Sequence, residues 1–230
     1  GGGNDTIIGS AADDTIIGGA GTDNLSGDAG NDTFLVNPGD GTDFFHGGAG
    51  TDTILAAADN VAIGIQTNKV ASNFEGIEII DAGGYTGVTI VGSGSGNSAY
   101  WDLMDFSNTT LVGITAIDGG GGNDTIIGSA ADDTIIGGDG YDVLNGGEGD
   151  DMLTGGAHGD AFVFDVDWGN DTIADFTDAD VLDLSSLGIS YDDINIVQSG
   201  SDVLISDVNG NSIVLLGIDV STIDNTDFSF

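Results

Sequence analysis

Large apolar residues recur every nine positions along two stretches of the chain, with two extra residues inserted once in each stretch. Each apolar residue lies at the centre of a short segment between glycine- and aspartate-rich turns. In a strand, successive side chains point to opposite faces, so each segment offers one large side chain to a core. The sequence therefore predicts an all-β fold of stacked short strands. The expected core residues are Ile7, Ile16, Leu25, Phe34, Phe45 and Ile54 in the first stretch, and Ile126, Ile135, Leu144, Leu153, Phe162 and Ile173 in the second.

An aspartate stands two residues before each of these apolar residues, and glycines precede the aspartate. The best copies read GGAGTDNLS, GGAGTDTIL, GGDGYDVLN and GGEGDDMLT, so the unit is G-G-x-G-x-D-x-U-x, with U a large apolar residue. Residues 1–19 recur without change at 120–138. We call the aspartates of this period the phase aspartates: Asp5, Asp14, Asp23, Asp32, Asp43, Asp52, Asp124, Asp133, Asp142, Asp151, Asp160 and Asp171.

This unit resembles the calcium-binding nonapeptide of RTX (repeat-in-toxin) proteins. The resemblance implies a right-handed parallel β-roll, a β-solenoid in which calcium lies between turns two repeats apart. It implies that ions are shared by Asp5 with Asp23, Asp14 with Asp32, Asp124 with Asp142, Asp133 with Asp151, and Asp142 with Asp160. Glycine turns supply carbonyl ligands in this interpretation, at Gly19, Gly21, Gly30, Gly48, Gly50, Gly120, Gly122, Gly138, Gly140, Gly147 and Gly149.

Some turns depart from the repeat. Ser10 and Ala12 stand where one repeat should have glycines, and the same two residue types stand in its copy at 128–136. His158 and Gly159 invert the last turn of the second block. We expect these turns to bind calcium weakly or not at all.

The composition strengthens the expectation of a cation. The chain carries 39 acidic residues against a single lysine or arginine, and its formal net charge of -38 excludes binding to nucleic acid or anionic membranes through a basic surface. Stacked turns bring the phase aspartates close together, so the repeats should not fold without a cation. A shell of carboxylate and carbonyl oxygens suits calcium rather than zinc or copper, and magnesium demands a tighter octahedron. Cysteine is absent, which excludes disulfides and thiolate metal sites.

The repeats and the composition divide the chain into four predicted parts. Residues 1–55 and 119–174 are two blocks of the roll. Residues 56–118 lose the nine-residue period but keep β-type runs, which predicts wider rungs of the same solenoid. Residues 175–230 contain Asn209-Gly210 between two alternating apolar runs, which predicts an antiparallel β-hairpin that caps the roll. The chain end, with Asp224, Asp227, Phe228 and Phe230, resembles the secretion signal of RTX proteins exported by type I secretion.

Other candidate chemistry gives weak signals. His46 and His158 are the only histidines and lie inside repeats, so we expect turn or strand roles for them and no catalytic residues in this region. Residues 165–171 alternate acids like a calcium loop but lack its glycine and final glutamate, so we interpret them as an irregular last turn. Tyr100, Trp101 and Phe106 form either part of the core or a patch for a ligand or partner, with core packing favoured.

These observations predict a calcium-dependent folding and secretion module of an extracellular RTX protein, which binds several calcium ions and is unfolded at low calcium. The type I secretion apparatus is the expected partner, and the chain is expected to be part of a longer protein. Two alternatives stay open. One is a structural repeat of an adhesin, surface layer or filament, in which calcium mediates self-assembly. The other is an accessory module of a secreted protease, lipase or alginate epimerase. Neither nucleic-acid binding nor membrane insertion is expected.

Overall fold

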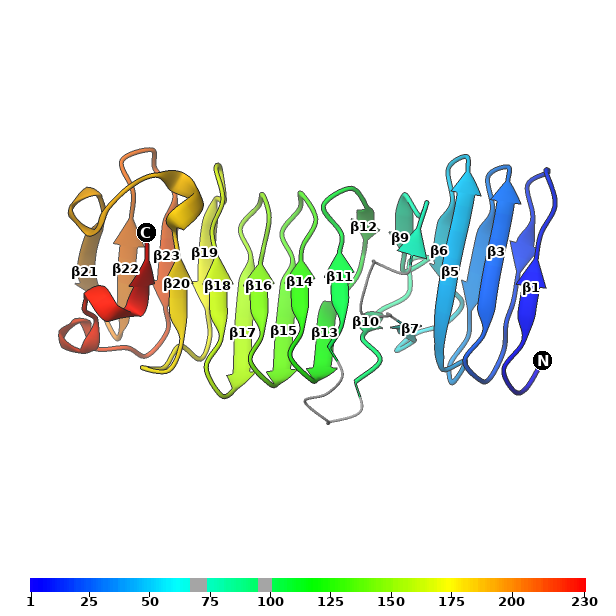
Figure 1. The fold of residues 1–230 in the computed structure, drawn as a ribbon, viewed down its shortest axis with the longest axis horizontal. Helices are drawn as coiled ribbons and strands as arrows, with labels where there is room; N and C mark the ends of the chain where they lie inside the picture. The colour runs from blue at the N-terminus through cyan, green and yellow to red at the C-terminus, as the bar shows by residue number, and fades with distance from the viewer. Residues whose placement is uncertain (67–73, 95–100) are drawn as a thin grey trace. The chain divides into compact units, whose positions relative to one another are not determined.

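The structure is a computed structural model that describes residues 1–66, 74–94 and 101–230. The chain forms two compact units. Unit 1 consists of Gly1–Gly94 and Asp102–Asp118, and unit 2 includes Gly119–Phe230. Within each unit, short strands separated by turns are stacked into sheets, and most neighbouring strands are parallel (Figure 1). The predicted parallel β-roll is confirmed.

Unit 1 holds two parallel sheets, and in its repeats consecutive strands alternate between them. Two strands therefore make one full turn of the roll, which we call a rung. One sheet contains, in spatial order, β1 (Thr6–Ile8), β3 (Asn24–Ala29), β5 (Thr42–Ala49), β7 (Ala62–Ile65), β10 (Thr89–Val91) and the start of β13 (Ala116–Gly121), with β8 (Phe74–Glu75) also paired to β5. The other contains β2 (Thr15–Ile16), β4 (Thr33–Val36), β6 (Thr53–Ala56), β9 (Ile79–Asp81) and β12 (Thr110–Val112). Strand β11 (Leu103–Asp105) also belongs to this unit.

Unit 2 repeats this arrangement over the second block and adds a C-terminal segment. One of its sheets contains β15 (Thr134–Asp139), β17 (Met152–Ala157), β19 (Asn170–Ile173), β23 (Ser212–Leu215), β22 (Asp202–Ser206) and β21 (Asn195–Ser199). The other contains β14 (Thr125–Ile127), β16 (Val143–Asn145), β18 (Ala161–Val163), β20 (Val181–Asp183) and β24 (Phe228–Ser229). Short 3₁₀ turns complete the unit: η1 (Ser185–Leu187), η2 (Tyr191–Asp193), η3 (Val220–Thr222) and η4 (Asn225–Asp227).

The length of a rung differs between the repeats and the segment that follows the first block. Within the repeats the register advances by 18 or 20 residues, as from Ile7 to Leu25 and from Leu25 to Phe45. After the first block, Ile54 pairs with Ile80, and Ile80 pairs with Leu111. These rungs take 26 and 31 residues, so they are wider than those of the repeats.

The core lies between the two sheets of each unit. Phe34 on β4 and Phe45 on β5 come from opposite sheets, and their ring centroids are 5.6 Å apart in an edge-to-face arrangement. All the expected core residues are buried except Ile7, which is half-buried. Phe106 is fully buried, as the core interpretation predicts, and Trp101 is half-buried. Tyr100 lies outside the described residues.

The predicted hairpin is present after the second block. Strands β22 and β23 pair antiparallel, with Ser206 opposite Ser212, and the turn between them contains Asn209 and Gly210. The C-terminal segment is antiparallel only in β21, β22 and β23, because β20 and β24 continue the parallel stacking, with Leu182 opposite Phe228. In the parts of the chain that the structure describes, no helix has the length and apolar character needed to cross a membrane.

Candidate metal centre

The phase aspartates stack in columns that follow the rungs. The columns are Asp5, Asp23, Asp43 and Asp14, Asp32, Asp52 in unit 1, and Asp124, Asp142, Asp160 and Asp133, Asp151, Asp171 in unit 2. Along each column, the backbone N–H of one aspartate donates to Oδ1 of the aspartate on the next rung, over 2.7 to 2.9 Å. Every pair that the RTX resemblance implies is therefore a pair of column neighbours, while the sharing of an ion by these pairs stays a prediction.

Six phase aspartates have one buried carboxylate oxygen without a hydrogen-bond partner among the described residues. Asp142 is 1% exposed and Asp151 is 2% exposed, so the two carboxylates have almost no access to solvent. An ionised carboxylate can accept several hydrogen bonds. A buried carboxylate that accepts only one hydrogen bond therefore keeps most of its charge uncompensated. The Oδ2 atoms that have no hydrogen-bond partner among the described residues include those of Asp23, Asp32, Asp52, Asp142, Asp151 and Asp160.

Each of these oxygens lies beside a glycine, and next to Asp32, Asp52 and Asp142 a backbone carbonyl oxygen borders the same space. A methyl group on Gly137 would lie 2.5 Å from Oδ2 of Asp142 and 2.7 Å from the carbonyl oxygen of Gly155 on the next rung. Gly27 shows the same arrangement with Asp32 and the carbonyl oxygen of Gly47. We call this space, bounded by a glycine, a carboxylate oxygen and a carbonyl oxygen, a cradle. Only glycine leaves it open.

The turns themselves need glycine for a second reason. At Gly138 the φ angle is 114°, and a side chain there would collide with the carbonyl oxygen of Gly120 on the preceding rung. A positive φ and close stacking of backbone both exclude larger residues. All the glycines predicted as ligands have positive φ: Gly19, Gly21, Gly30, Gly48, Gly50, Gly120, Gly122, Gly138, Gly140, Gly147 and Gly149.

The two repeats that carry serine satisfy their aspartate differently. The backbone N–H and the hydroxyl of Ser129 both donate to Oδ2 of Asp133, over 2.7 and 2.9 Å. Ser10 makes the same two bonds to Asp14, over 2.6 and 2.9 Å. In these turns the serine donates to the Oδ2 atom, which is the carboxylate oxygen that has no partner at residues such as Asp142. This bonding gives a physical reason to expect weak calcium binding at these turns.

Burial raises the pKa of several column carboxyls, with loss of solvent as the largest cause. The pKa rises to about 6 at Asp43 and Asp142, to about 7 at Asp151 and to about 8 at Asp171. Repulsion between neighbouring carboxylates adds to the rise, from Asp160 at Asp142 and from Asp151 at Asp171. Near neutral pH, the columns therefore favour a bound proton or a bound cation over a bare charge.

Two column members were missed by the nine-residue period. The N–H of Asp160 donates to Oδ1 of Asp180 over 2.8 Å, and the other oxygen of Asp180 accepts bonds from the N–H and hydroxyl of Thr177. The N–H of Asp52 donates to Oε2 of Glu78 over 2.8 Å, so a glutamate continues that column. Asp180 could have been found in the sequence, because it follows Asp160 by the same 20 residues that separate Asp151 from Asp171.

The described residues contain no group of three or more histidine or acidic side chains that could hold a metal ion by themselves. The cradles offer backbone carbonyl oxygens as further ligands for an ion in the columns. His46 lies half-buried in β5, and His158 lies in a turn with φ of 87° and its Nδ1 2.8 Å from the Ala157 carbonyl oxygen. Both have the turn or strand positions that the sequence predicts.

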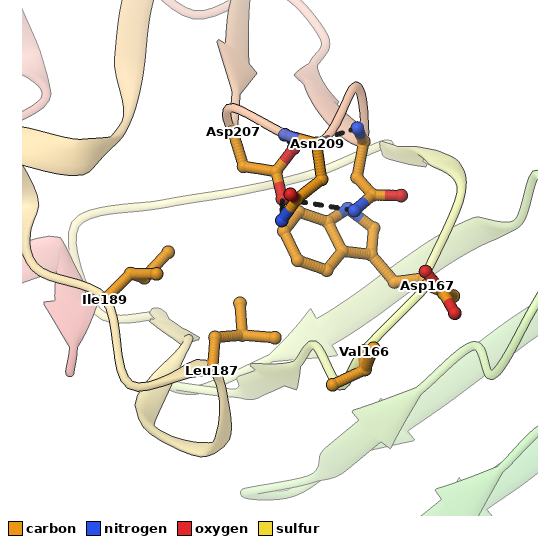
Figure 2. Close-up of a pocket in the computed structure, with 8 residues that line it drawn as sticks. Val166, Asp167, Leu187, Ile189, Asp207 and Asn209 are labelled. Carbon is orange, nitrogen blue, oxygen red and sulfur yellow. Dashed lines mark hydrogen bonds between the residues drawn. The ribbon is translucent and has the colours of Figure 1, made fainter.

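A small cavity of about 90 Å³ lies beside the C-terminal segment of unit 2, away from the cradles (Figure 2). Val166, Leu187 and Ile189 lie opposite Asp207 and Asn209 in the close-up. The Asp207 carboxylate is occupied by its own turn, because it accepts bonds from the backbone and side chain of Asn209 over 2.8 and 3.0 Å. Part of the cavity is lined by residues 166–168 of the segment 165–171. This segment ends inside β19, which begins at Asn170, as expected for an irregular last turn.

The sequence pattern of the RTX calcium-binding nonapeptide repeat matches the chain in four copies, at residues 1–34, 39–60, 113–144 and 127–162. The chain is an RTX-type repeat protein. RTX nonapeptide repeats bind calcium, and proteins that carry them are typically secreted. The buried unpaired oxygens, the open cradles and the all-oxygen donor set of this RTX protein fit that ion. Its repeats form a calcium-binding module.

Two solved structures are similar to this RTX protein. A subunit of the mannuronan C5-epimerase from Azotobacter vinelandii is 23% identical, with a TM-score of 0.35 over 58% of this chain and 80% of that chain. The extracellular lipase LipA from Serratia marcescens is 22% identical, with a TM-score of 0.35 over 99% of this chain, which spans 40% of the lipase. No curated protein matches the sequence significantly.

Proposed function

We propose that this RTX chain is a calcium-dependent folding module of a secreted protein. The observation that carries the proposal is the set of buried phase aspartates whose second carboxylate oxygen has no hydrogen-bond partner among the described residues, as at Asp142 and Asp151. A buried charge without a partner costs several kcal/mol. Since the same arrangement recurs from rung to rung, the ion-free roll is unstable near neutral pH.

Calcium supplies the missing positive charge and accepts oxygen ligands in a flexible geometry. The phase aspartates with unpaired oxygens would hold it, together with carbonyl oxygens of the glycine turns, such as that of Gly155 beside Asp142. These ligands come from neighbouring rungs, so they meet only in the folded roll. Because the unfolded chain cannot assemble such a site, the free energy of binding is added to the free energy of folding.

This coupling supports a role in secretion. Extracellular calcium modules have dissociation constants of about 0.1 to 1 mM. The concentration of free calcium in the cytosol is far below this range. The chain would therefore stay unfolded inside the cell, where an unfolded chain can pass through a type I secretion apparatus, and would fold outside. In this proposal the region binds calcium and folds, and catalysis belongs to another part of a longer protein.

Circular dichroism during a calcium titration tests the proposal. In EDTA near neutral pH the spectrum should be that of a mostly disordered chain, and millimolar calcium should produce a cooperative β signal. Magnesium at the same concentration should largely fail, since it prefers a tighter octahedron than the cradles offer. Spectra that do not change with calcium would overturn the proposal, and an equal response to magnesium would indicate general charge screening.

A further inference from the structure

The last cradle of the first block is completed by residues outside the repeats. A methyl group on Gly47 would lie 2.5 Å from Oδ2 of Asp52 and would collide with the carbonyl oxygen of Gly76. At the preceding cradle, Gly27 faces Asp32 and a carbonyl oxygen from the next repeat in the same way. Gly76 therefore takes the place of a repeat glycine, although it lies in the irregular segment that follows the block.

Glu78 takes the place of the next phase aspartate in the same column. The N–H of Asp32 donates to Oδ1 of Asp52 over 2.7 Å, and the N–H of Asp52 donates to Oε2 of Glu78 over 2.8 Å. The glutamate thus repeats the contact that holds each pair of phase aspartates together. The register of β6 and β9 places Glu78 opposite Asp52, although the rung between them is 26 residues long.

A second observation points to a ligand at this place. Asp52 has no exposed surface, and its Oδ2 has no hydrogen-bond partner among the described residues. This oxygen faces the Gly47 cradle, and the carboxylate lies next to that of Glu78. Two neighbouring carboxylates and a carbonyl oxygen, with no basic side chain among them, form a donor set for a hard divalent cation.

We propose that Asp52, Glu78 and the Gly76 carbonyl hold a calcium ion beyond the nonapeptide repeats, at the end of the first block. This inference rests on the proposed calcium-dependent function and extends it to residues that the repeat does not contain. An open groove of about 220 Å³, which Glu75, Gly76, Glu78 and Asp105 help to line, gives solvent access to the site. The ion would link the last repeat of the block to the wider rung that follows it, because its ligands come from both.

Counting bound calcium by native mass spectrometry tests the proposal on the full chain. Glu78→Gln removes the charge but keeps a side-chain oxygen that can accept the Asp52 N–H, and we expect it to bind one calcium ion fewer than the unmodified chain. Glu75→Gln is the matched control, because Glu75 is exposed in the same groove and accepts no hydrogen bond from a phase aspartate in the described part of the chain. It should keep the full count. An unchanged count for a folded Glu78→Gln chain would overturn the inference.

A second measurement uses the unmodified chain, so it holds even if Glu78→Gln does not fold. The only glutamates are Glu75, Glu78 and Glu148, so labelling glutamate with ¹³C at the carboxyl gives three signals. Glu75→Gln and Glu148→Gln, both at exposed positions, assign them. Exchange of calcium for cadmium, an ion of similar radius, should shift the Glu78 signal and leave the other two in place. A Glu78 signal that does not move would contradict the proposal. A chain that binds no calcium at all would instead refute the proposed function.

Discussion

Asp142→Asn should have opposite effects on stability with and without calcium. The carboxylate of Asp142 is 1% exposed, its Oδ2 has no hydrogen-bond partner among the described residues, and burial raises its pKa from 3.8 to about 6. That rise corresponds to about 3 kcal/mol of destabilisation at a pH above both values. Asparagine carries no charge and keeps an oxygen for the N–H of Asp124, which lies 2.7 Å from Oδ1. In EDTA at pH about 7.5, the variant should therefore be more stable, by up to about 3 kcal/mol.

With calcium present the same substitution should be harmful. In the proposed arrangement Asp142 faces one ion shared with Asp124 and one shared with Asp160. At about 10 mM calcium, a site with a Kd of about 0.1 to 1 mM contributes about 1.4 to 2.7 kcal/mol. Loss of both sites should lower the calcium-linked stabilisation by about 3 to 5 kcal/mol, where this quantity is the difference in unfolding free energy between calcium and EDTA. Asp5, at the first rung, faces a single partner, so Asp5→Asn should lose about half as much.

Urea unfolding followed by circular dichroism measures both effects. Sucrose in all samples stabilises the folded state, so that the unfolding free energy of the ion-free roll can be measured. Asp183→Asn is the control, because Asp183 is half-buried on β20, lies outside the columns and accepts an N–H bond from Ser185 over 2.9 Å. It should leave the calcium-linked stabilisation unchanged. The reasoning is refuted if Asp142→Asn lowers stability in EDTA, or if its calcium-linked stabilisation equals that of Asp183→Asn.

Three further predictions follow from the same geometry. Because the carboxyl pKa values are raised from 3.8 in the unfolded chain to about 6, 7 and 8 in the folded roll, the ion-free roll should be most stable near pH 4. It should lose stability progressively as the pH rises from about 4 to about 8; a pH series of urea unfolding in EDTA and sucrose checks this, and a flat profile would contradict it. Gly137→Ala fills the cradle beside Asp142 and should lower the unfolding free energy in calcium by the contribution of one ion, about 1.4 to 2.7 kcal/mol. The control is Gly2→Ala, whose added methyl group meets no atom within 4 Å and should change the unfolding free energy by less than about 0.5 kcal/mol in the same assay. Ser129→Ala removes a hydroxyl bond to Asp133 and should destabilise the roll by about 1 kcal/mol in calcium and in EDTA alike; a loss seen only in calcium would indicate an ion at that turn.

The repeats were predictable because their chemistry is local and periodic. One apolar residue and one aspartate in each nine residues define both the inward face and the turn, so residues such as Phe34 and Asp32 could be placed before the fold was known. The proximity of Asp124 to Asp142 was implied by the resemblance to RTX proteins, in which two repeats make one rung. The hairpin at Asn209 and Gly210 was predictable for a similar reason, since it depends on a short local turn, which spans residues 207–211 between the paired Ser206 and Ser212.

Features that depend on the length of a rung were not predictable. Glu78 joins a column of aspartates because the rung that separates it from Asp52 has 26 residues. The repeats of the sequence do not have this spacing, so they could not predict the position of Glu78. Ser129 marks a departure from the repeat, but its two bonds to Asp133 became clear only from the geometry of the turn. The parallel pairing of β24 with β20 joins residues 46 positions apart, Leu182 and Phe228, and local sequence carries no signal for such a contact.

The most direct test of calcium-coupled folding is the radius of gyration of the chain by small-angle X-ray scattering, in EDTA and in millimolar calcium at the same neutral pH. An unfolded chain of 230 residues has a radius of gyration of about 50 Å. The account predicts a value near this in EDTA and a cooperative fall to that of a folded protein as calcium is added, reversed by chelation. A chain that is equally compact in EDTA and in calcium would contradict it.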